Sequence, residues 1–222
     1  MRQICENYEL SDISIFSLNS IIRIGAIGKD GEVYGYQTSI KPAGIHVEKL
    51  NRYNALATRV CEQKTEPETL MSLLEEAGNL EWDYPVWMSV AGFILALGCI
   101  CMMFNGTFKD VACVAVSTVV MFVLGMILSG PGLNSILKNA ISMFVAGCLA
   151  KLYHSFGLCD NYYTILLTNG FMLIPGIQLV NSIRNLLRGN EMNGIIELLK
   201  VILETFAIIV GIVSSVLVLG GI

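Results

Sequence analysis

The sequence has few charged residues. Asp, Glu, Lys and Arg make up 14% of its 222 residues, whereas a soluble domain usually has about 25%. The deficit is uneven, because residues 1–85 hold 13 of the 18 acids and eight of the 14 bases, leaving five acids and six bases for residues 86–222. This division predicts a water-soluble domain over residues 1–85 and a transmembrane domain over residues 86–222.

Other scarce residue types exclude several chemistries. The two histidines, His46 and His154, lie far apart, and the seven cysteines are scattered without the spacing of a redox or zinc motif. The sequence has no basic cluster and a net charge of −4, so nucleic acid is not an expected partner. The run "GAIGKDG" lacks Ser or Thr after Lys29 and is typical of a hairpin turn rather than a phosphate loop. We expect no metal, no cofactor and no enzymatic activity.

The first 85 residues predict a small α+β domain. Residues 11–40 contain β-branched, partly alternating runs on both sides of "KDG", as in strands joined by a turn. Residues 45–63 have apolar residues at helical spacing, and a second helix follows with Thr65 as its expected cap and Glu68 three residues later. The polar start of the sequence has no signal-peptide pattern, so we expect this domain to be cytosolic.

The rest of the chain contains five hydrophobic segments, each long enough to cross about 30 Å of hydrocarbon as a helix. The third contains Lys138 and Lys151 near its ends, whose long side chains can reach the membrane surface. The fold class is thus a mainly α membrane protein, a five-helix transmembrane bundle with a small N-terminal cytosolic α+β domain. The predicted spans are about 86–104, 111–128, 136–156, 161–183 and 195–222.

The basic residues of the loops predict the orientation. One side of the bundle carries Lys109 and Lys151, and the other carries Lys138, Arg184 and Arg188. Positive residues favour the cytoplasmic side. We therefore expect a multi-pass protein of the inner (plasma) membrane, with its N-terminus in the cytoplasm and its C-terminus outside.

The fourth span is interrupted by polar and helix-breaking residues. Pro175 removes a backbone donor and Gly176 adds freedom, close to the middle of the span. Gln178, Asn181 and Asn185 then follow along one helical stripe. Transporters use broken helices to bind substrate, but a proline kink with polar contacts between helices gives the same pattern. The candidate transport-path residues are Asn169, Pro175, Gly176, Gln178, Asn181 and Asn185.

Two acidic residues of the membrane domain are candidates for proton coupling. Glu204 precedes 18 uncharged residues, and a buried carboxylate there can bind protons. The alternative for Glu204 is an ordinary pair with Lys200 at the start of the helix. Asp110 is the second candidate, and its alternative role is to cap the second span.

Four segments together resemble a known family. "PGIQLVNSIRNLLRGN", "FNGTFKDVACVAVSTVVM", "RQICENY" and "GIHVEKLNRYNAL" occur in an order that resembles the threonine/serine exporter family, most closely its split, two-subunit form linked to succinate export. Two positions depart from that pattern. Asn185 stands where many relatives have Asp, and Gln178 stands where some have a second Pro.

The resemblance implies a membrane component of a secondary exporter for small polar metabolites, either threonine and serine or a dicarboxylate such as succinate. It also implies a second, separately encoded membrane subunit. The geometry agrees for two reasons. Five spans without an internal repeat form only one wall of a site, and the polar stripe of the fourth span must be shielded from lipid by another protein surface. The alternative is a membrane-anchored ligand sensor or assembly protein without transport activity.

Overall fold

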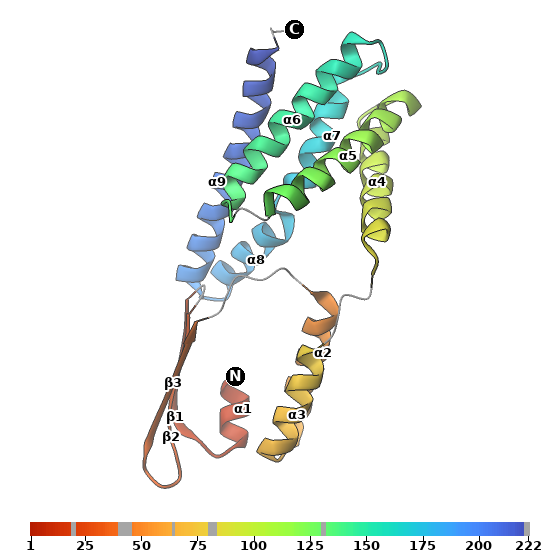
Figure 1. The fold of residues 1–222 in the computed structure, drawn as a ribbon. Coiled ribbons are helices and arrows are strands. Elements are labelled where there is room, and N and C mark those ends of the chain that lie inside the picture. The colour runs from red at the N-terminus through yellow and green to blue at the C-terminus, as the bar shows by residue number, and fades with distance from the viewer. Residues whose placement is uncertain (19–20, 40–45, 64, 80–83, 130–131, 220–222) are drawn as a thin grey trace. The chain divides into compact units, whose positions relative to one another are not determined.

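The computed structural model describes residues 1–18, 21–39, 46–63, 65–79, 84–129 and 132–219. Residues 220–222 of the fifth predicted span lie outside this set. The chain divides into two compact units, Met1–Asp83 and Tyr84–Ile222. Each unit is described by itself below (Figure 1).

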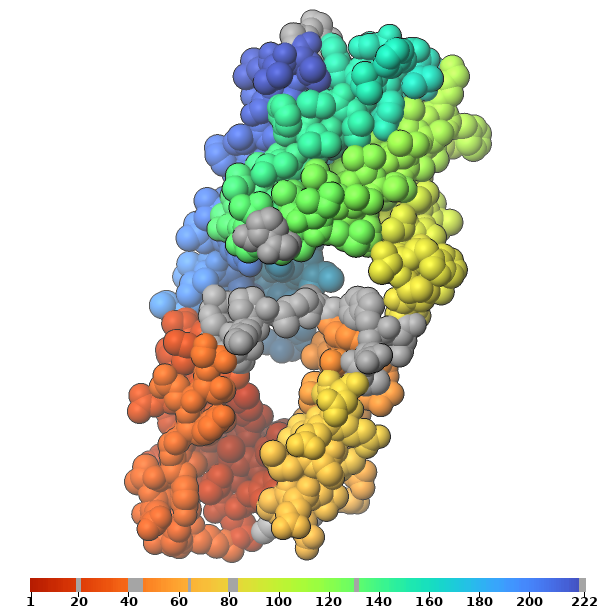
Figure 2. Space-filling model, in the orientation of Figure 1, coloured from red at the N-terminus to blue at the C-terminus, as the bar shows by residue number. Residues whose placement is uncertain are grey.

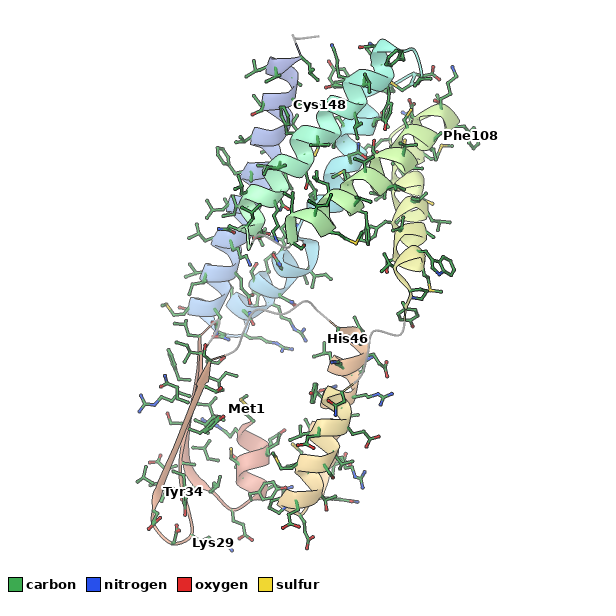
Figure 3. All side chains as sticks on the ribbon, viewed as in Figure 1. Met1, Lys29, Tyr34, His46, Phe108 and Cys148 are labelled. Carbon is green, nitrogen blue, oxygen red and sulfur yellow. The ribbon has the colours of Figure 1, made fainter. Side chains whose placement is uncertain are left out.

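The first unit contains a three-stranded antiparallel sheet in the order β1 (Ser11–Leu18), β2 (Ile21–Ile27) and β3 (Val33–Ser39). The "GAIGKDG" run forms the β2–β3 turn, as predicted: the Gly28 amide donates to the Glu32 carbonyl at 2.9 Å. Gly31 has φ +78°, which favours glycine. The Tyr34 hydroxyl donates to Asp30 at 2.6 Å, at the hairpin end where Figure 3 labels Lys29 and Tyr34.

Three helices complete the unit: α1 (Arg2–Asn7), α2 (Val47–Glu62) and α3 (Pro67–Gly78). The Asn7 amide donates to the Val60 carbonyl at 2.6 Å and so ties α1 to α2. The Lys49 ammonium donates to the Gly78 carbonyl at 2.7 Å and ties α2 to α3. The expected cap at Thr65 is wrong, since Glu66 is the N-cap and Pro67 opens the helix. Proline suits that position because its fixed φ and missing N–H cost nothing there.

In the second unit, all the regular secondary structure of the described residues is helical. Its helices are α4 (Val86–Met103), α5 (Phe108–Ser129), α6 (Ser135–Ser155), α7 (Tyr162–Leu173), α8 (Gly176–Leu187) and α9 (Glu191–Val218). Four of them, α4, α5, α6 and α9, are long and apolar enough to cross a membrane. The α7–α8 pair adds a fifth span if it is counted as one. The structure therefore supports four to five spans. The side chains of α5 and α6 meet on one face of this unit (Figure 2).

The predicted fourth span is two helices that differ in direction by 54°. The break lies at Ile174 and Pro175, and the second helix runs to Leu187, beyond the predicted end at residue 183. Ile174 is extended, with ψ 123°, because a residue before proline is driven out of the helical region. With 12 residues, α7 is about 18 Å long, too short to cross a bilayer by itself.

The helices α6 and α9 pack closely through small residues and lie side by side in Figure 1. A Cβ added at Gly211 of α9 would lie 2.5 Å from the Ala140 carbonyl oxygen and 2.9 Å from the Met143 Cβ on α6. Small residues let helix backbones approach in this way, and dispersion contacts replace the hydrophobic effect that lipid cannot supply. A larger side chain at Gly211 is therefore expected to weaken the packing of α9 on α6.

We predict that Gly211→Val destabilises the protein by about 1–3 kcal/mol, the usual cost of overpacking. The matched control is Gly125→Val on α5, where an added Cβ has no neighbour within 4 Å. Thermal unfolding of both purified variants in detergent measures the effect. Equal melting temperatures for the two variants would show that the α6–α9 contact tolerates a side chain at this position.

Candidate functional site

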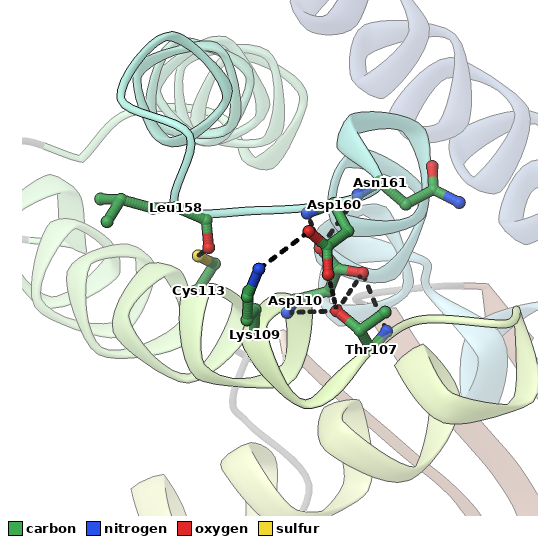
Figure 4. A network of polar contacts seen from close by, with 7 residues as sticks. All are labelled: Thr107, Lys109, Asp110, Cys113, Leu158, Asp160 and Asn161. Carbon is green, nitrogen blue, oxygen red and sulfur yellow. Dashed lines mark hydrogen bonds and ion pairs between the residues drawn. The ribbon is translucent and has the colours of Figure 1, made fainter.

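The Asp110 carboxylate lies at the start of α5 and is fully buried. Its Oδ2 accepts hydrogen bonds from the Thr107 amide at 2.8 Å and from the Thr107 hydroxyl at 3.0 Å (Figure 4). The Asp110 amide lies 3.4 Å from the Thr107 hydroxyl oxygen, to which it donates. This reciprocal arrangement is a capping box, which satisfies backbone donors at a helix start. The capping residue is therefore Thr107, and Asp110 supports it from within the helix.

The same carboxylate also holds the start of α7. Its Oδ1 accepts from the Asp160 amide at 2.9 Å and from the Asn161 amide at 3.1 Å. At the surface, Asp160 accepts from the Lys109 ammonium at 3.2 Å. The Thr107 hydroxyl lies 3.0 Å from an oxygen of each carboxylate, and its single hydrogen is donated to one of the two at a time. One buried anion thus joins two helix N-termini, where the helix dipole favours negative charge. Three backbone amides and the shared Thr107 hydroxyl surround the Asp110 carboxylate, so the geometry favours a structural role. The part of Asp110 in proton coupling stays a prediction.

Glu204 is a buried acid inside the long α9 helix, with 3% of its surface exposed. The Ser135 hydroxyl, at the start of α6, donates to its Oε1 at 2.5 Å. The Lys200 ammonium lies 4.0 Å from the same oxygen, as the expected spacing of four residues allows. Sequence reasoning missed Ser135 because it is 69 residues away from Glu204. Glu204 therefore lies at the α6–α9 contact rather than at an exposed helix start.

Asn169 lies in α7 and is fully buried. Neither its Oδ1 nor its Nδ2 has a hydrogen-bond partner within the described residues. Its neighbour Thr168 differs, since the Thr168 hydroxyl donates to the Thr164 carbonyl at 2.7 Å within the same helix. Unpaired buried amides are rare because each lost hydrogen bond is costly. Asn169 is the candidate side chain best suited to receive a polar ligand.

The polar stripe of α8 is divided between two environments. Gln178 and Asn181 are exposed, whereas Asn185 is half-buried and donates to Glu197 of α9 at 3.0 Å. Ser182 forms the buried face of α8. The candidate path residues therefore do not share one surface, since Asn169 is buried in the bundle. Helical periodicity gives the stripe correctly but does not say which part of it the neighbouring helix α9 covers.

Comparison with known proteins assigns the family. A family model described as "Putative threonine/serine exporter" matches residues 1–219, which includes both units. No curated protein and no solved structure matches the chain. The match agrees with the resemblance carried by the motifs and with the four to five apolar helices. The chain is a multi-pass membrane protein that belongs to the threonine/serine exporter family.

Proposed function

We propose that the chain is the membrane component of a secondary exporter, with threonine and serine as the first metabolites to test and succinate as the competing one. The single observation that carries this proposal is the fully buried Asn169 amide, six residues before the break at Pro175, whose two polar atoms have no partner among the residues that the structure describes. An amide offers two donors and an acceptor oxygen to a hydroxyl, ammonium or carboxylate group. The family supports the substrate class.

The helix break adds backbone groups to the proposed path. The first hydrogen bond within α8 runs from the Leu179 amide to the Pro175 carbonyl at 3.0 Å, and the Gly176 amide donates to the Ile174 carbonyl at 2.8 Å. Within the described residues, no side chain caps this end of the helix. The amides of the first turn of a helix lack partners within the helix and attract anionic groups. Broken helices of transporters bind substrate carboxylates in this way. Gly176 leaves space at this turn, since nothing lies within 4 Å of an added Cβ.

We predict that Asn169→Leu lowers export about tenfold or more, the loss expected when one hydrogen-bonding group of a substrate site is removed. The melting temperature should not fall, because the amide makes no hydrogen bond in the described residues that leucine would break. Thr168→Val is the control, since the Thr168 hydroxyl already has a partner in the Thr164 carbonyl of the same helix. Radiolabelled threonine efflux from proteoliposomes that contain the chain together with its proposed second subunit measures the effect. Unchanged efflux by Asn169→Leu would remove this residue from the path.

One experiment distinguishes the roles of the two acidic candidates for proton coupling, Glu204 and Asp110. Glu204→Gln keeps an acceptor for the Ser135 hydroxyl, so we expect a folded protein whose export no longer depends on a proton gradient. Asp110→Asn places an amide among four donors, so we expect a lower melting temperature instead. Efflux with and without an imposed pH gradient, together with thermal unfolding, measures both. A gradient dependence that survives in Glu204→Gln would exclude Glu204 as the coupling residue.

A second membrane subunit completes the proposed exporter. The α8 helix exposes polar Gln178 and Asn181 and also apolar Ile177, Val180 and Leu187, with exposed fractions of 63%, 64% and 83% for these three. Lipid covers the apolar side chains well, but it offers no hydrogen bond to the two amides. A partner packed against α8 would pair them and form the second wall of the path.

We predict that the purified chain alone gives no metabolite flux in proteoliposomes, and that a separately encoded membrane protein restores it. Co-purification followed by flux measurement identifies the partner. As a matched pair, Asn181→Leu should reduce flux, whereas Val180→Leu on the neighbouring exposed face should not. Robust flux by the chain alone would contradict the two-subunit proposal. Ligand binding without flux, alone or with a partner, would favour the alternative of a membrane-anchored sensor.

The proposed orientation places the N-terminal unit and the α8–α9 connection in the cytoplasm of the cell, beside the inner membrane. The support is the basic character of Lys138, Arg184 and Arg188 against Lys109 and Lys151. In a cysteine-free background, we expect single cysteines at positions 30 and 190 to resist a membrane-impermeant thiol reagent in intact cells. A cysteine at position 157 should react. Reaction of position 30 or 190 from outside would reverse the orientation.

A further inference from the structure

A cavity lies where α6 ends and α7 begins. The end of α6 and the starts of α5 and α7 lie at the same end of the second unit (Figure 1), where Asp110 joins α5 to α7; this connection is called the Asp110 joint below. Its volume is about 260 Å³. Pockets for drug-sized ligands are roughly 300–1,000 Å³, so this cavity suits a metabolite of few heavy atoms. It is lined by Lys151, His154, Asp160, Asn161, Tyr162 and Tyr163.

Charges of both signs line this cavity. Lys151 is half-buried, and within the described residues its ammonium has no ion-pair partner. Asp160 is paired with Lys109 at 3.2 Å and with the Thr107 hydroxyl at 3.0 Å. A carboxylate accepts about four hydrogen bonds, so Asp160 retains acceptor capacity. The cavity thus offers a cation to a carboxylate and an anion to an ammonium group.

Aromatic rings form another part of the lining. The His154 and Tyr162 rings have centroids 6.1 Å apart, and the Tyr162 and Tyr163 rings have centroids 5.5 Å apart. Tyrosine faces attract ammonium groups at such sites. Tyr162 is 8% exposed and therefore held by its surroundings, whereas Tyr163 is 58% exposed and accessible from outside the bundle.

The wall formed by the start of α7 is fixed by its hydrogen bonds. The Asn161 side chain accepts from the Thr164 amide at 3.3 Å, and the buried Asp110 holds the backbone amides of Asp160 and Asn161 (Figure 4). A site whose groups are held in place before binding loses less free energy in ordering them. The Asp110 joint therefore gives this cavity a rigid wall.

We infer that this cavity binds a small zwitterion, namely the amino acid carried by the exporter, with Lys151 facing the carboxylate and Asp160 facing the ammonium group. The inference rests on the proposed export function and narrows its substrate class. If a dicarboxylate bound here, its second carboxylate would lie next to the Asp160 carboxylate, and contact between two negative charges is unfavourable. Along α7, Asn169 lies eight residues from Asn161, which is about 12 Å at the helical rise. The cavity is therefore at the end of the proposed path, on the outer side in the proposed orientation.

The test is equilibrium binding of radiolabelled threonine to the purified full chain in lipid-free detergent. Lys151→Gln should weaken binding about tenfold or more, the loss expected for one charge-assisted hydrogen bond. Lys138→Gln, near the other end of α6, is the matched control and should change affinity less than about twofold. Absence of binding by the unaltered chain, or equal affinity in Lys151→Gln, would overturn the inference.

Competition experiments distinguish the ligand class. Unlabelled serine should displace threonine, and succinate should not; displacement by succinate as strong as by serine would overturn the zwitterion assignment. Phosphatidylethanolamine carries the same pair of charges in its headgroup. Loss of threonine binding on adding this lipid would show instead a lipid site at the membrane surface.

Flux measurements separate this inference from the proposed function. If Lys151→Gln exports threonine with an unchanged KM, the cavity proposal fails while export stands. If the unaltered chain and its partner export no metabolite, the export proposal fails. Threonine binding that is lost in Lys151→Gln would then still support the cavity as a site.

Discussion

Polar groups inside a membrane bundle must find partners within the protein, because lipid offers none. The Asp110 carboxylate meets this requirement for two helices together. It accepts from Thr107 at the start of α5 and from the backbone of Asp160 and Asn161 at the start of α7. Each helix start otherwise exposes several unpaired amides. The Asp110 carboxylate thus joins the starts of α5 and α7, beside the core side chains that these helices share, and it holds the backbone that forms one wall of the cavity.

Asn169 does not meet this requirement within the described residues. Thr118, Thr168 and Thr205 each donate to a carbonyl four residues earlier in the same helix. The fully buried Asn169 amide differs from them, because it has no hydrogen-bond partner in the described part of the chain. An asparagine with a purely structural role would need a hydrogen bond to a neighbour to offset the free-energy cost of burying its amide. This contrast between satisfied hydroxyls and an unsatisfied amide is the packing feature of α7 on which the proposed transport role of Asn169 rests.

The helix break at Pro175 and the α6–α9 contact differ in how closely the helices on either side are joined. Gly211 lets α9 approach α6 closely. By contrast, Pro175 separates α7 from α8, and α8 packs mainly on α9, to which the Asn185–Glu197 hydrogen bond also joins it. The tightly packed α6–α9 pair is thus next to a pair of helices whose direction changes by 54°.

The sequence by itself determined the features that depend on neighbouring residues: the uncharged runs that form apolar helices, the "GAIGKDG" hairpin turn and the break at Pro175. The order of its motifs also indicated the family to which the chain belongs. Even local reasoning failed at Thr65, where Pro67 shifted the helix start. Only the tertiary structure decided that Asp110 meets Asn161, that Ser135 meets Glu204, and that Asn169 is buried while Gln178 is exposed. Helical periodicity states which residues share a face, but the packing of distant helices decides what that face contacts.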